Sequence, residues 1–429
     1  MIDIRLLREQ YASVKENYAR RKNPELLKLV AQVKEYDEEW RKAEQKKQEL
    51  TAEKNKLSKS INEAKKQGKD LKPILKKVNE LQEEVRNATI VAEDLRLRSV
   101  NGIKKLPNLL HESVPYGKDD TENQEVRSWG KKTKPKHELL SHAQCAERLG
   151  VAEFDRARKI AGTGYYTLKG DLVRLHQALI NFALDRLVKK GFAAIEPPLM
   201  MRREPYEGVT DLADFEKVMY KIDGDDAYLI ATSEHPLCAM HMDEVIPEHE
   251  LPITYVGLSP CFRREVGAHG MDEKGLLRTH QFWKVEQVVI CKPGDAELWH
   301  ENIIKNAEEL FAALELPYRV VNICTGDMGT VAAKKYDIEV WMPRQQAYKE
   351  VVSGSNCTDY QARGLNIKYG AQGGEKHYAH TLNSTAIATS RAMVAILENC
   401  QNPDGTLTIP KVLQPYMGNQ KLITAGKKK

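Results

Sequence analysis

The stretch CFRREVGAHGMDEKGLLRTHQFWKVE, residues 261–286, places two adjacent arginines and a glutamate before a glycine-containing loop and an alternating run. We predict two strands, 253–264 and 278–291, joined by a loop over 265–277. A strand turns alternate side chains to the same face, and here that face combines cations, an aromatic ring and a carboxylate: Arg278, His280, Phe282, Lys284 and Glu286. Such a face is poor core material, although taken alone it also fits an exposed hairpin with surface ion pairs.

Polar groups recur at the ends of other predicted elements. They are Thr232-Ser233-Glu234, the run Glu350 to Ser353, and Asn383-Ser384-Thr385 followed by Arg391. This repetition favours a binding site over an isolated surface hairpin. The sequence contains no GxxxxGK[ST], no GxGxxG after a strand, no GxSxG and no HExxH. A bound nucleotide would therefore need something other than a P-loop to hold its phosphates.

Beyond this stretch, the pattern of the second half of the chain predicts a mixture of helices and short strands. Helices are predicted at 171–190, 295–315 and 382–400, and strands at 227–233, 253–258, 279–290, 318–323, 338–343 and 347–352. Strands and helices do not alternate regularly. The pattern therefore predicts an α+β fold with a mainly antiparallel sheet flanked by helices.

Residues 31–100 have a different composition, with 31 charged residues among 70 and a single glycine, Gly68. Apolar residues recur at steps of three and four over 33–64 and again over 71–95, and the period breaks at 65–73. Lys47 and Lys54 occupy two positions of the first stripe, where long lysine stems can lie along an apolar seam. We predict an antiparallel helical hairpin whose first helix is about 48 Å long.

The predicted hairpin has two possible uses. Lysine and arginine outnumber acids by 17 to 14 within 31–100. This segment alone is typical of a solvated coiled coil used for oligomerisation. The alternative is a basic arm that lies along a nucleic-acid backbone.

Composition restricts the class of protein. The chain has 429 residues, 41% of them hydrophobic, and a net charge of +5. The longest apolar runs fall short of the roughly 20 residues that cross a bilayer, and the first residues lack a secretory apolar segment. Seven scattered cysteines without a CxxC pair indicate reduced thiols. These features predict a cytoplasmic protein without a membrane segment.

Several motifs together resemble a known family. CFRRE and its loop resemble motif 2 of class II aminoacyl-tRNA synthetases, and GFAAIEPPLMM (191–201) resembles motif 1. RTHQFWKVEQ (278–287), TSE (232–234), EVVSGSNCTDYQAR (350–363) and HTLNSTAIATSR (380–391) resemble the seryl-tRNA synthetases. TSE and NSTA (383–386) look like archaeal or eukaryotic forms of that family. The motifs occur in the expected order along nearly the whole chain.

The resemblance implies a fold, a reaction and a set of site residues. It implies a class II antiparallel sheet, activation of L-serine with ATP and Mg²⁺, and transfer to tRNA-Ser, with tRNA-Sec as a second candidate. The implied catalytic residues are Arg263 and Arg391. The implied ATP contacts are Arg263, Arg264, Glu265, Arg278, Thr279, Phe282, Glu350, Val351, Val352, Ser353 and Arg391. The implied serine contacts are Thr232, Ser233, Glu234, Arg263, Glu286, Asn383 and Thr385, and the implied Mg²⁺ ligands are Glu350 and Ser353.

The resemblance also implies a domain division and a homodimer. Residues 1–110 would form the tRNA-binding helical coiled-coil arm, 111–165 a linker region, and 166–429 the class II catalytic domain. The sequence departs from the family pattern at Met271, Lys274 and Gly364. Three rival interpretations are a non-catalytic paralogue that kept the fold, a structural coiled-coil protein with an incidental globular head, and a synthetase of different specificity.

Overall fold

The computed structural model describes residues 1–68, 70–211, 216–265, 275–371 and 373–425. The chain divides into two compact units, Ile2–Leu109 and Leu110–Lys429, with Met1 grouped with the second. The motif 2 loop positions Met271 and Lys274, and the terminal lysines 427–429, lie outside the described residues.

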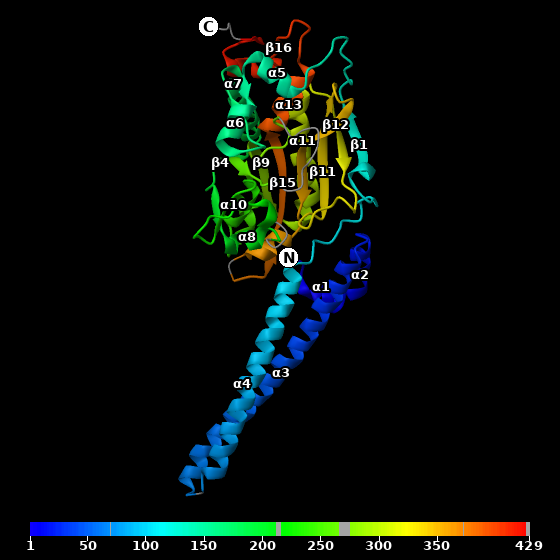
Figure 1. Ribbon diagram of the computed structural model, residues 1–429. Helices are drawn as coiled ribbons and strands as arrows, with labels where there is room; N and C mark the ends of the chain where they lie inside the picture. Colours follow the sequence, from blue (N-terminus) through cyan, green and yellow to red (C-terminus); the bar gives the residue numbers. More distant parts are fainter. Residues whose placement is uncertain (69, 212–215, 266–274, 372, 426–429) are drawn as a thin grey trace. The chain divides into compact units, whose positions relative to one another are not determined.

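The first unit is helical. It contains α1 (Ile4–Glu9), α2 (Tyr11–Ala19) and two long antiparallel helices, α3 (Pro24–Lys66) and α4 (Lys72–Lys104) (Figure 1). The Asn23 side chain accepts hydrogen bonds from the backbone N–H groups of Glu25 and Leu26, and Pro24 occupies the first turn. This cap starts α3 at Pro24 rather than at the predicted residue 33. The predicted antiparallel coiled-coil hairpin is confirmed.

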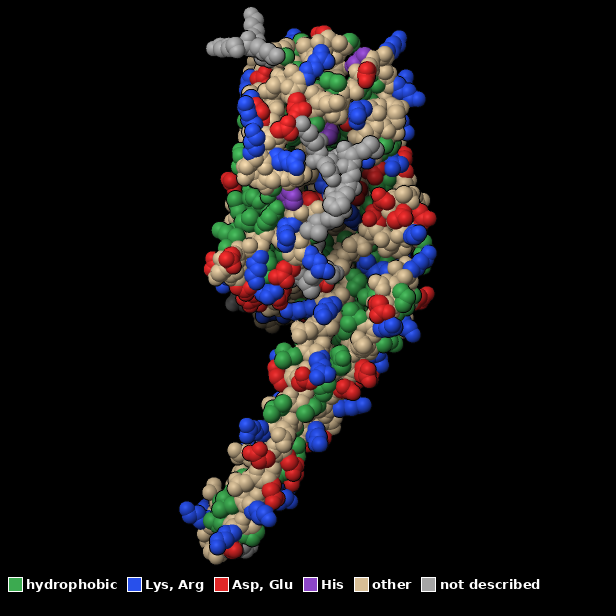
Figure 2. Space-filling model, in the orientation of Figure 1, with side chains coloured by type: hydrophobic (Ala, Val, Ile, Leu, Met, Phe, Trp, Pro, Cys, Tyr) green, Lys and Arg blue, Asp and Glu red, His purple; other side chains and the backbone are tan. Residues whose placement is uncertain are grey.

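The hairpin buries its own apolar seam. Val30 and Val33 of α3 are buried, as are Leu81 and Ala92 of α4. The two helices approach closely at Gly102, where a Cβ would lie 2.6 Å from Val33 Cγ2. The solvent face carries interspersed acidic and basic side chains (Figure 2). Since the two helices cover each other, the hairpin has an internal contact surface of its own.

The second unit is built on an eight-stranded sheet in the order β1-β10-β11-β12-β15-β9-β8-β4 (Figure 1). The strands are β1 (Gln124–Trp129), β4 (Ala193–Ile195), β8 (Ile253–Phe262), β9 (Gln281–Cys291), β10 (Tyr318–Asn322), β11 (Lys334–Met342), β12 (Ala347–Asn356) and β15 (His380–Ala388). Neighbouring strands are antiparallel, apart from the β4–β8 pair. The predicted α+β class II architecture is confirmed.

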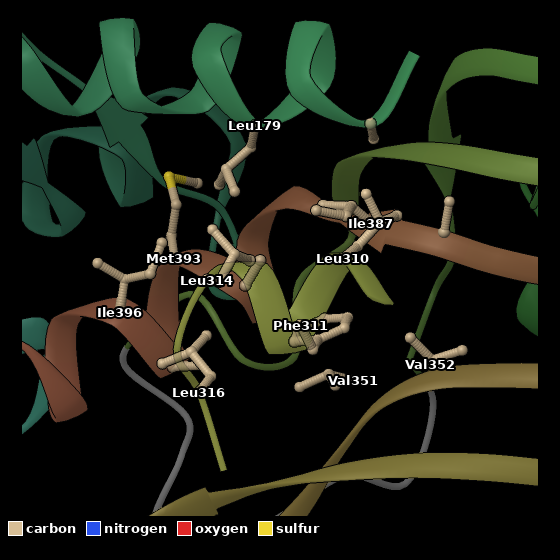
Figure 3. Close-up of a cluster of buried hydrophobic side chains, with 14 of the residues drawn as sticks. Leu179, Leu310, Phe311, Leu314, Leu316, Val351, Val352, Ile387, Met393 and Ile396 are labelled. Atoms are coloured by element: carbon tan, nitrogen blue, oxygen red, sulfur yellow. The ribbon is translucent and has the colours of Figure 1, made fainter. Parts of the chain in front are cut away.

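Helices cover both faces of this sheet. One face packs on α7 (Asp171–Lys189), α11 (Ala296–Ala313) and α13 (Thr389–Asn399), where Leu179, Phe311 and Met393 are buried in the main core (Figure 3). A second apolar cluster forms with α8 (Arg203–Val209), α10 (Glu234–Ala239) and α12 (Tyr360–Leu365). Along β9, Val285 and Val289 join the first cluster and Val288 and Ile290 the second, as strand alternation requires.

The prediction of a helix over 382–400 is wrong in its first part. Residues His380–Ala388 form β15 in the middle of the sheet, and α13 begins only at Thr389. The apolar spacing at Leu382, Ala386 and Ile387 imitates a helix because a β-bulge interrupts strand alternation there. Pairing with β9 and β12 on either side decides the conformation.

Two further segments differ from the sequence-based expectation. Over the predicted strand 227–233, β6 spans only Ala227–Leu229, and α10 begins at Glu234. The predicted linker 111–165 contains β1, which pairs with β10 at the edge of the sheet, and also α5 (His142–Leu149) and α6 (Phe154–Ala161). This segment is therefore part of the second unit's structure.

The described helices include none that is long and apolar enough to cross a membrane. All seven cysteines are thiols and none is part of a disulfide.

Candidate active site

A cavity of about 350 Å³ opens on the sheet face opposite α11 and draws its lining from β9, β11, β12 and β15, from the segments that follow β8 and precede β9, and from the starts of α10 and α13. Its lining residues are Glu234, Arg263, Glu265, Leu277, Arg278, Thr279, Phe282, Lys284, Glu286, Lys335, Glu350, Val351, Ser353, Ser355, Asn383, Thr385, Ala388, Ser390 and Arg391. Most of the site residues predicted from the motifs therefore meet in one place.

The β8–β9 hairpin supplies two arginines. Arg263 follows β8, donates from Nε to the Ala231 carbonyl at 3.2 Å, and lies 5.4 Å from the centre of the Phe282 ring. Arg278 is largely exposed and its Nε donates to Glu265 Oε2 at 2.7 Å. The guanidinium of Arg263 is thus fixed by a backbone carbonyl, whereas that of the more exposed Arg278 is paired with Glu265.

A bulge in β12 brings Glu350 and Ser353 to the cavity together. Glu339 of β11 pairs with Glu350 and Ile338 with Val352, so Val351 is an extra residue without a partner of its own. Val351 and Val352 both lie in the apolar cluster with Phe311 (Figure 3). Strict alternation would place residues 350 and 353 on opposite faces, whereas the bulge leaves both at the cavity.

The neighbouring strand β15 uses the same construction. Thr385 pairs with Glu286 and Ile387 with Val285, which leaves Ala386 without a partner. Ala386 and Ile387 lie in the main core, whereas Thr385 and Ala388 line the cavity. Two bulges therefore turn polar positions of adjacent strands toward the same space.

Two carboxylates and an ammonium group lie together at the deep side of the cavity. Lys284 Nζ is 2.7 Å from Glu286 Oε2, and both side chains are buried. Glu234 Oε1 accepts a hydrogen bond of 2.8 Å from the buried Gln361 amide. Removal from bulk water, and secondly the charge of Glu286, raise the pKa of Glu234 to about 7 despite the nearby cations. Additional positive charge here would be stabilised.

A second charged group surrounds Glu350. Arg391 Nη1 donates to Glu350 Oε1 at 2.8 Å, and Lys335 lines the cavity beside them. Burial alone would raise the pKa of Glu350, but the charges of Arg391 and Lys335 outweigh it and hold that pKa below its usual value. Glu350 is therefore a carboxylate at neutral pH.

Four of the predicted site residues are not among those that line the cavity. Thr232 and Ser233 are buried, and Thr232 Oγ1 accepts from the backbone N–H of Glu234 at the start of α10. Arg264 is exposed, and Val352 points into the main core. These four residues are thus close in the chain to residues that line the cavity, but they do not line it themselves.

Close packing between two helices explains the glycine at position 364. A Cβ on Gly364 would lie 2.0 Å from the carbonyl oxygen of Gly208, where α12 approaches α8. An arginine at this position would therefore force the two helices apart.

Sequence reasoning missed several residues that line the cavity. They are Leu277, Lys284, Lys335, Ser355, Ala388 and Ser390. Lys284 was on the predicted polar face but was given no role. Lys335 and Ser355 pair directly across β11 and β12, and alternation along KKYDIEV (334–340) is the signal that could have found Lys335.

The residues at the β12 bulge fit a hard divalent cation. Glu350 and Ser353 offer a carboxylate and a hydroxyl oxygen on one side of the strand, which are the donor types that Mg²⁺ prefers. Among the described residues, no group of three or more His, Cys, Asp and Glu side chains is arranged around a metal position. Mg²⁺ would therefore complete its shell with substrate phosphates and water.

Comparison with known proteins agrees with this geometry. Residues 217–400 match the family described as tRNA synthetase class II core domain (G, H, P, S and T), and residues 1–110 match the seryl-tRNA synthetase N-terminal domain. The fold is thus that of a class II aminoacyl-tRNA synthetase.

Individual relatives narrow the assignment. A serine–tRNA ligase from Methanocella arvoryzae is 54% identical over 97% of this chain and 99% of its own length. The crystal structure of seryl-tRNA synthetase from Pyrococcus horikoshii complexed with ATP has a TM-score of 0.95, 46% identity, and full coverage of both chains. The cytoplasmic serine–tRNA ligase of Naegleria fowleri in complex with AMP has a TM-score of 0.89 and 34% identity, with 100% of this chain and 99% of its own covered. The chain belongs to the seryl-tRNA synthetase family, and the resemblance predicted from the motifs is confirmed.

Proposed function

We propose that this chain activates L-serine with ATP and transfers the seryl group to tRNA-Ser. The observation that carries the proposal is one cavity lined both by Arg263 and Arg278 and by the carboxylates of Glu234 and Glu286. A zwitterionic amino acid and a polyphosphate need groups of both charges in one site. Family membership and the printed names of the relatives agree with it.

In the first step an oxygen of the serine carboxylate attacks the α-phosphorus of ATP. A new P–O bond forms, the bond to the β-phosphate oxygen breaks, and pyrophosphate leaves with the electron pair, so seryl-adenylate remains. In the second step the terminal ribose hydroxyl of tRNA attacks the seryl carbonyl carbon and AMP leaves. Neither step needs a protein nucleophile, so the protein's contribution is positioning and charge stabilisation.

ATP would lie along the hairpin and the β12 bulge. Arg263 would contact the α-phosphate and Arg278 the outer phosphates, after exchanging its ion pair with Glu265 for the nucleotide. Phe282 and Arg391 would enclose the adenine by stacking and cation–π attraction. The remaining predicted contacts are Arg264, Glu265, Thr279, Glu350, Val351, Val352 and Ser353.

Glu350 and Ser353 would hold Mg²⁺ beside the phosphates. When bound, the cation neutralises charge that develops on the phosphate oxygens. Arg263 performs the same task with a fixed guanidinium group, while Arg391 holds the adenine, and we propose these two as the catalytic residues. Because they are held in place before the reaction, they require no reorganisation during it.

Serine selection would fall to the deep side of the cavity. Glu234 and Glu286 would receive the serine ammonium and hydroxyl, Arg263 the carboxylate, and Asn383 and Thr385 would complete the polar contacts. Alanine lacks the hydroxyl, so binding it would leave buried polar groups unpaired. Thr232 would also fix the start of α10, on which Glu234 stands, and Ser233 stays a predicted serine contact.

Binding of tRNA would use the helical hairpin of the first unit. Its exposed lysines and arginines suit the phosphate backbone of a double-helical RNA segment. A homodimer is also part of the proposal. A cytoplasmic location and tRNA-Sec as a second substrate also stay predictions, as do the assignments of 1–110 to the tRNA-binding arm and of 166–429 to the catalytic domain.

The direct test is serine-dependent exchange of pyrophosphate into ATP. The unaltered protein should catalyse exchange with serine, but not with alanine. Arg263→Ala removes a fixed cation from the place where charge gathers, so exchange should fall by about 100-fold while the fold is kept. Absence of serine-dependent exchange in the unaltered protein would contradict the proposal and favour a non-catalytic paralogue.

A further inference from the structure

We propose that Asp337 is an additional ligand of the divalent cation, and that Lys335 occupies this position in the metal-free protein. The inference rests on the proposed function, because it concerns the cation that would bind at Glu350 and Ser353. Neither Asp337 nor Lys335 belongs to the motif-derived site.

Strand register turns both residues to the face of β11 that carries the cavity, where Lys335 lines the cavity and Asp337 is buried beside Ser353. Asp337 pairs directly with Ser353, and Lys335 pairs directly with Ser355. Directly opposed residues of antiparallel strands point to the same face, and both serines line the cavity. The next residue along, Ile338, is buried in the main core on the other face. The Asp337 carboxyl therefore lies next to the Ser353 hydroxyl at the edge of the proposed metal position.

Asp337 is buried but incompletely satisfied. The residue is 6% exposed, and its Oδ1 atom has no hydrogen-bond partner. Its other oxygen, Oδ2, lies 3.3 Å from Lys335 Nζ. A buried carboxylate oxygen without a partner is costly and requires an explanation. A bound cation would satisfy it.

The chemistry of the cluster suits this role. Asp337, Glu350 and Ser353 supply two carboxylates and a hydroxyl, which is a common protein contribution to a Mg²⁺ site that also includes phosphate and water. Lys335 lies against Oδ2 of the same carboxyl group whose Oδ1 a cation would use. Its ammonium group can therefore balance the charge of this carboxyl group before metal binding and turn toward the anionic phosphates afterwards.

The alternative is that Asp337 serves only to orient Lys335. The two interpretations differ in what Lys335→Met does to metal affinity. If Lys335 competes with the cation, its removal should tighten binding of the metal. If the pair is structural, removing either partner should disturb the site in the same direction.

The experiment measures binding of Mn²⁺ alone to the full-length protein, by the electron paramagnetic resonance signal of the unbound ion. Asp337→Asn and Glu350→Gln should each weaken Mn²⁺ binding by about tenfold or more. Lys335→Met should tighten it. Glu308→Gln is the matched control, because Glu308 lies in α11 on the other face of the sheet and is paired with Arg127. This control should bind Mn²⁺ like the unaltered protein, and thermal unfolding without metal should confirm that every variant is folded.

The outcomes distinguish a failure of this inference from a failure of the metal site that belongs to the proposed function. If Glu350→Gln weakens Mn²⁺ binding and Asp337→Asn does not, the metal site stands and the role of Asp337 is overturned. If neither change matters, both the site and the inference fail. If Lys335→Met weakens binding as much as Asp337→Asn, the two residues are a structural pair, and the inference is again overturned.

Discussion

Glu234 shows how a single residue can link serine binding to pH. Its pKa, raised to about 7 by burial and by the charge of Glu286, means that lowering the pH through neutrality protonates it. The protonated form cannot pair with the serine ammonium. Lys284, Arg263 and the Gln361 amide also face this carboxyl and favour its charged form.

We therefore expect kcat/KM for serine in pyrophosphate exchange to rise as pH increases to about 7 and then to level off. Glu234→Gln should lower kcat/KM and remove this rise, whereas KM for ATP should change little in either protein. Glu286→Gln is the comparison, since it removes the neighbouring charge and should move the midpoint of the rise to lower pH. A pH profile that keeps its shape in Glu234→Gln would assign the titration to another group.

At the scale of elements, the strands that carry the site depend on close packing against α11. A Cβ on Gly354 of β12 would lie 2.3 Å from Ile304 Cδ1 of α11 and 2.9 Å from Ser384 Oγ of β15. The same strand carries Glu350 and Ser353, so any displacement of β12 reaches the cavity.

We predict that Gly354→Ala lowers the free energy of unfolding by about 1–3 kcal/mol through overpacking, and that it also slows exchange. Ile304→Val removes the terminal methyl group that the new Cβ would meet. The double variant should therefore be more stable than Gly354→Ala alone, as measured by urea unfolding. Simple addition of the two single effects would show that α11 does not set the position of β12.

The elements also show where sequence reasoning succeeds and fails. The helices at 171–190 and 295–315 were predictable because their apolar period is regular and close to 3.6 residues. β15 was not, because its bulge at Ala386 breaks the two-residue period that identifies a strand. The β12 bulge likewise brings together Glu350 and Ser353, whose shared face follows from the motif resemblance and not from alternation. Lys335 and Asp337 were missed because their importance depends on register with β12, which pairing across strands determines.

At the scale of the whole molecule, the proposed roles divide between the two units. The cavity residues all lie beyond residue 230, within the second unit, whereas the first unit is a hairpin that buries its own seam. Cutting the hairpin at residues 34 and 96 keeps Val30 and Val33 together with Gly102 and Ile103 at its base. The longer part can then be removed together with its own seam residues, such as Leu81 and Ala92, without opening the core of the second unit.

The most direct test of the account compares two activities in one shortened protein, with residues 34–96 replaced by a short Gly/Ser linker. Serine-dependent pyrophosphate exchange should stay within a few-fold of the full-length value, because every cavity residue is retained. Charging of tRNA-Ser should collapse, and the steep salt dependence of tRNA binding in the full-length protein should flatten, since the lost lysines and arginines no longer displace counterions. Efficient charging of tRNA-Ser by the shortened protein, or loss of both activities in a folded one, would contradict the account.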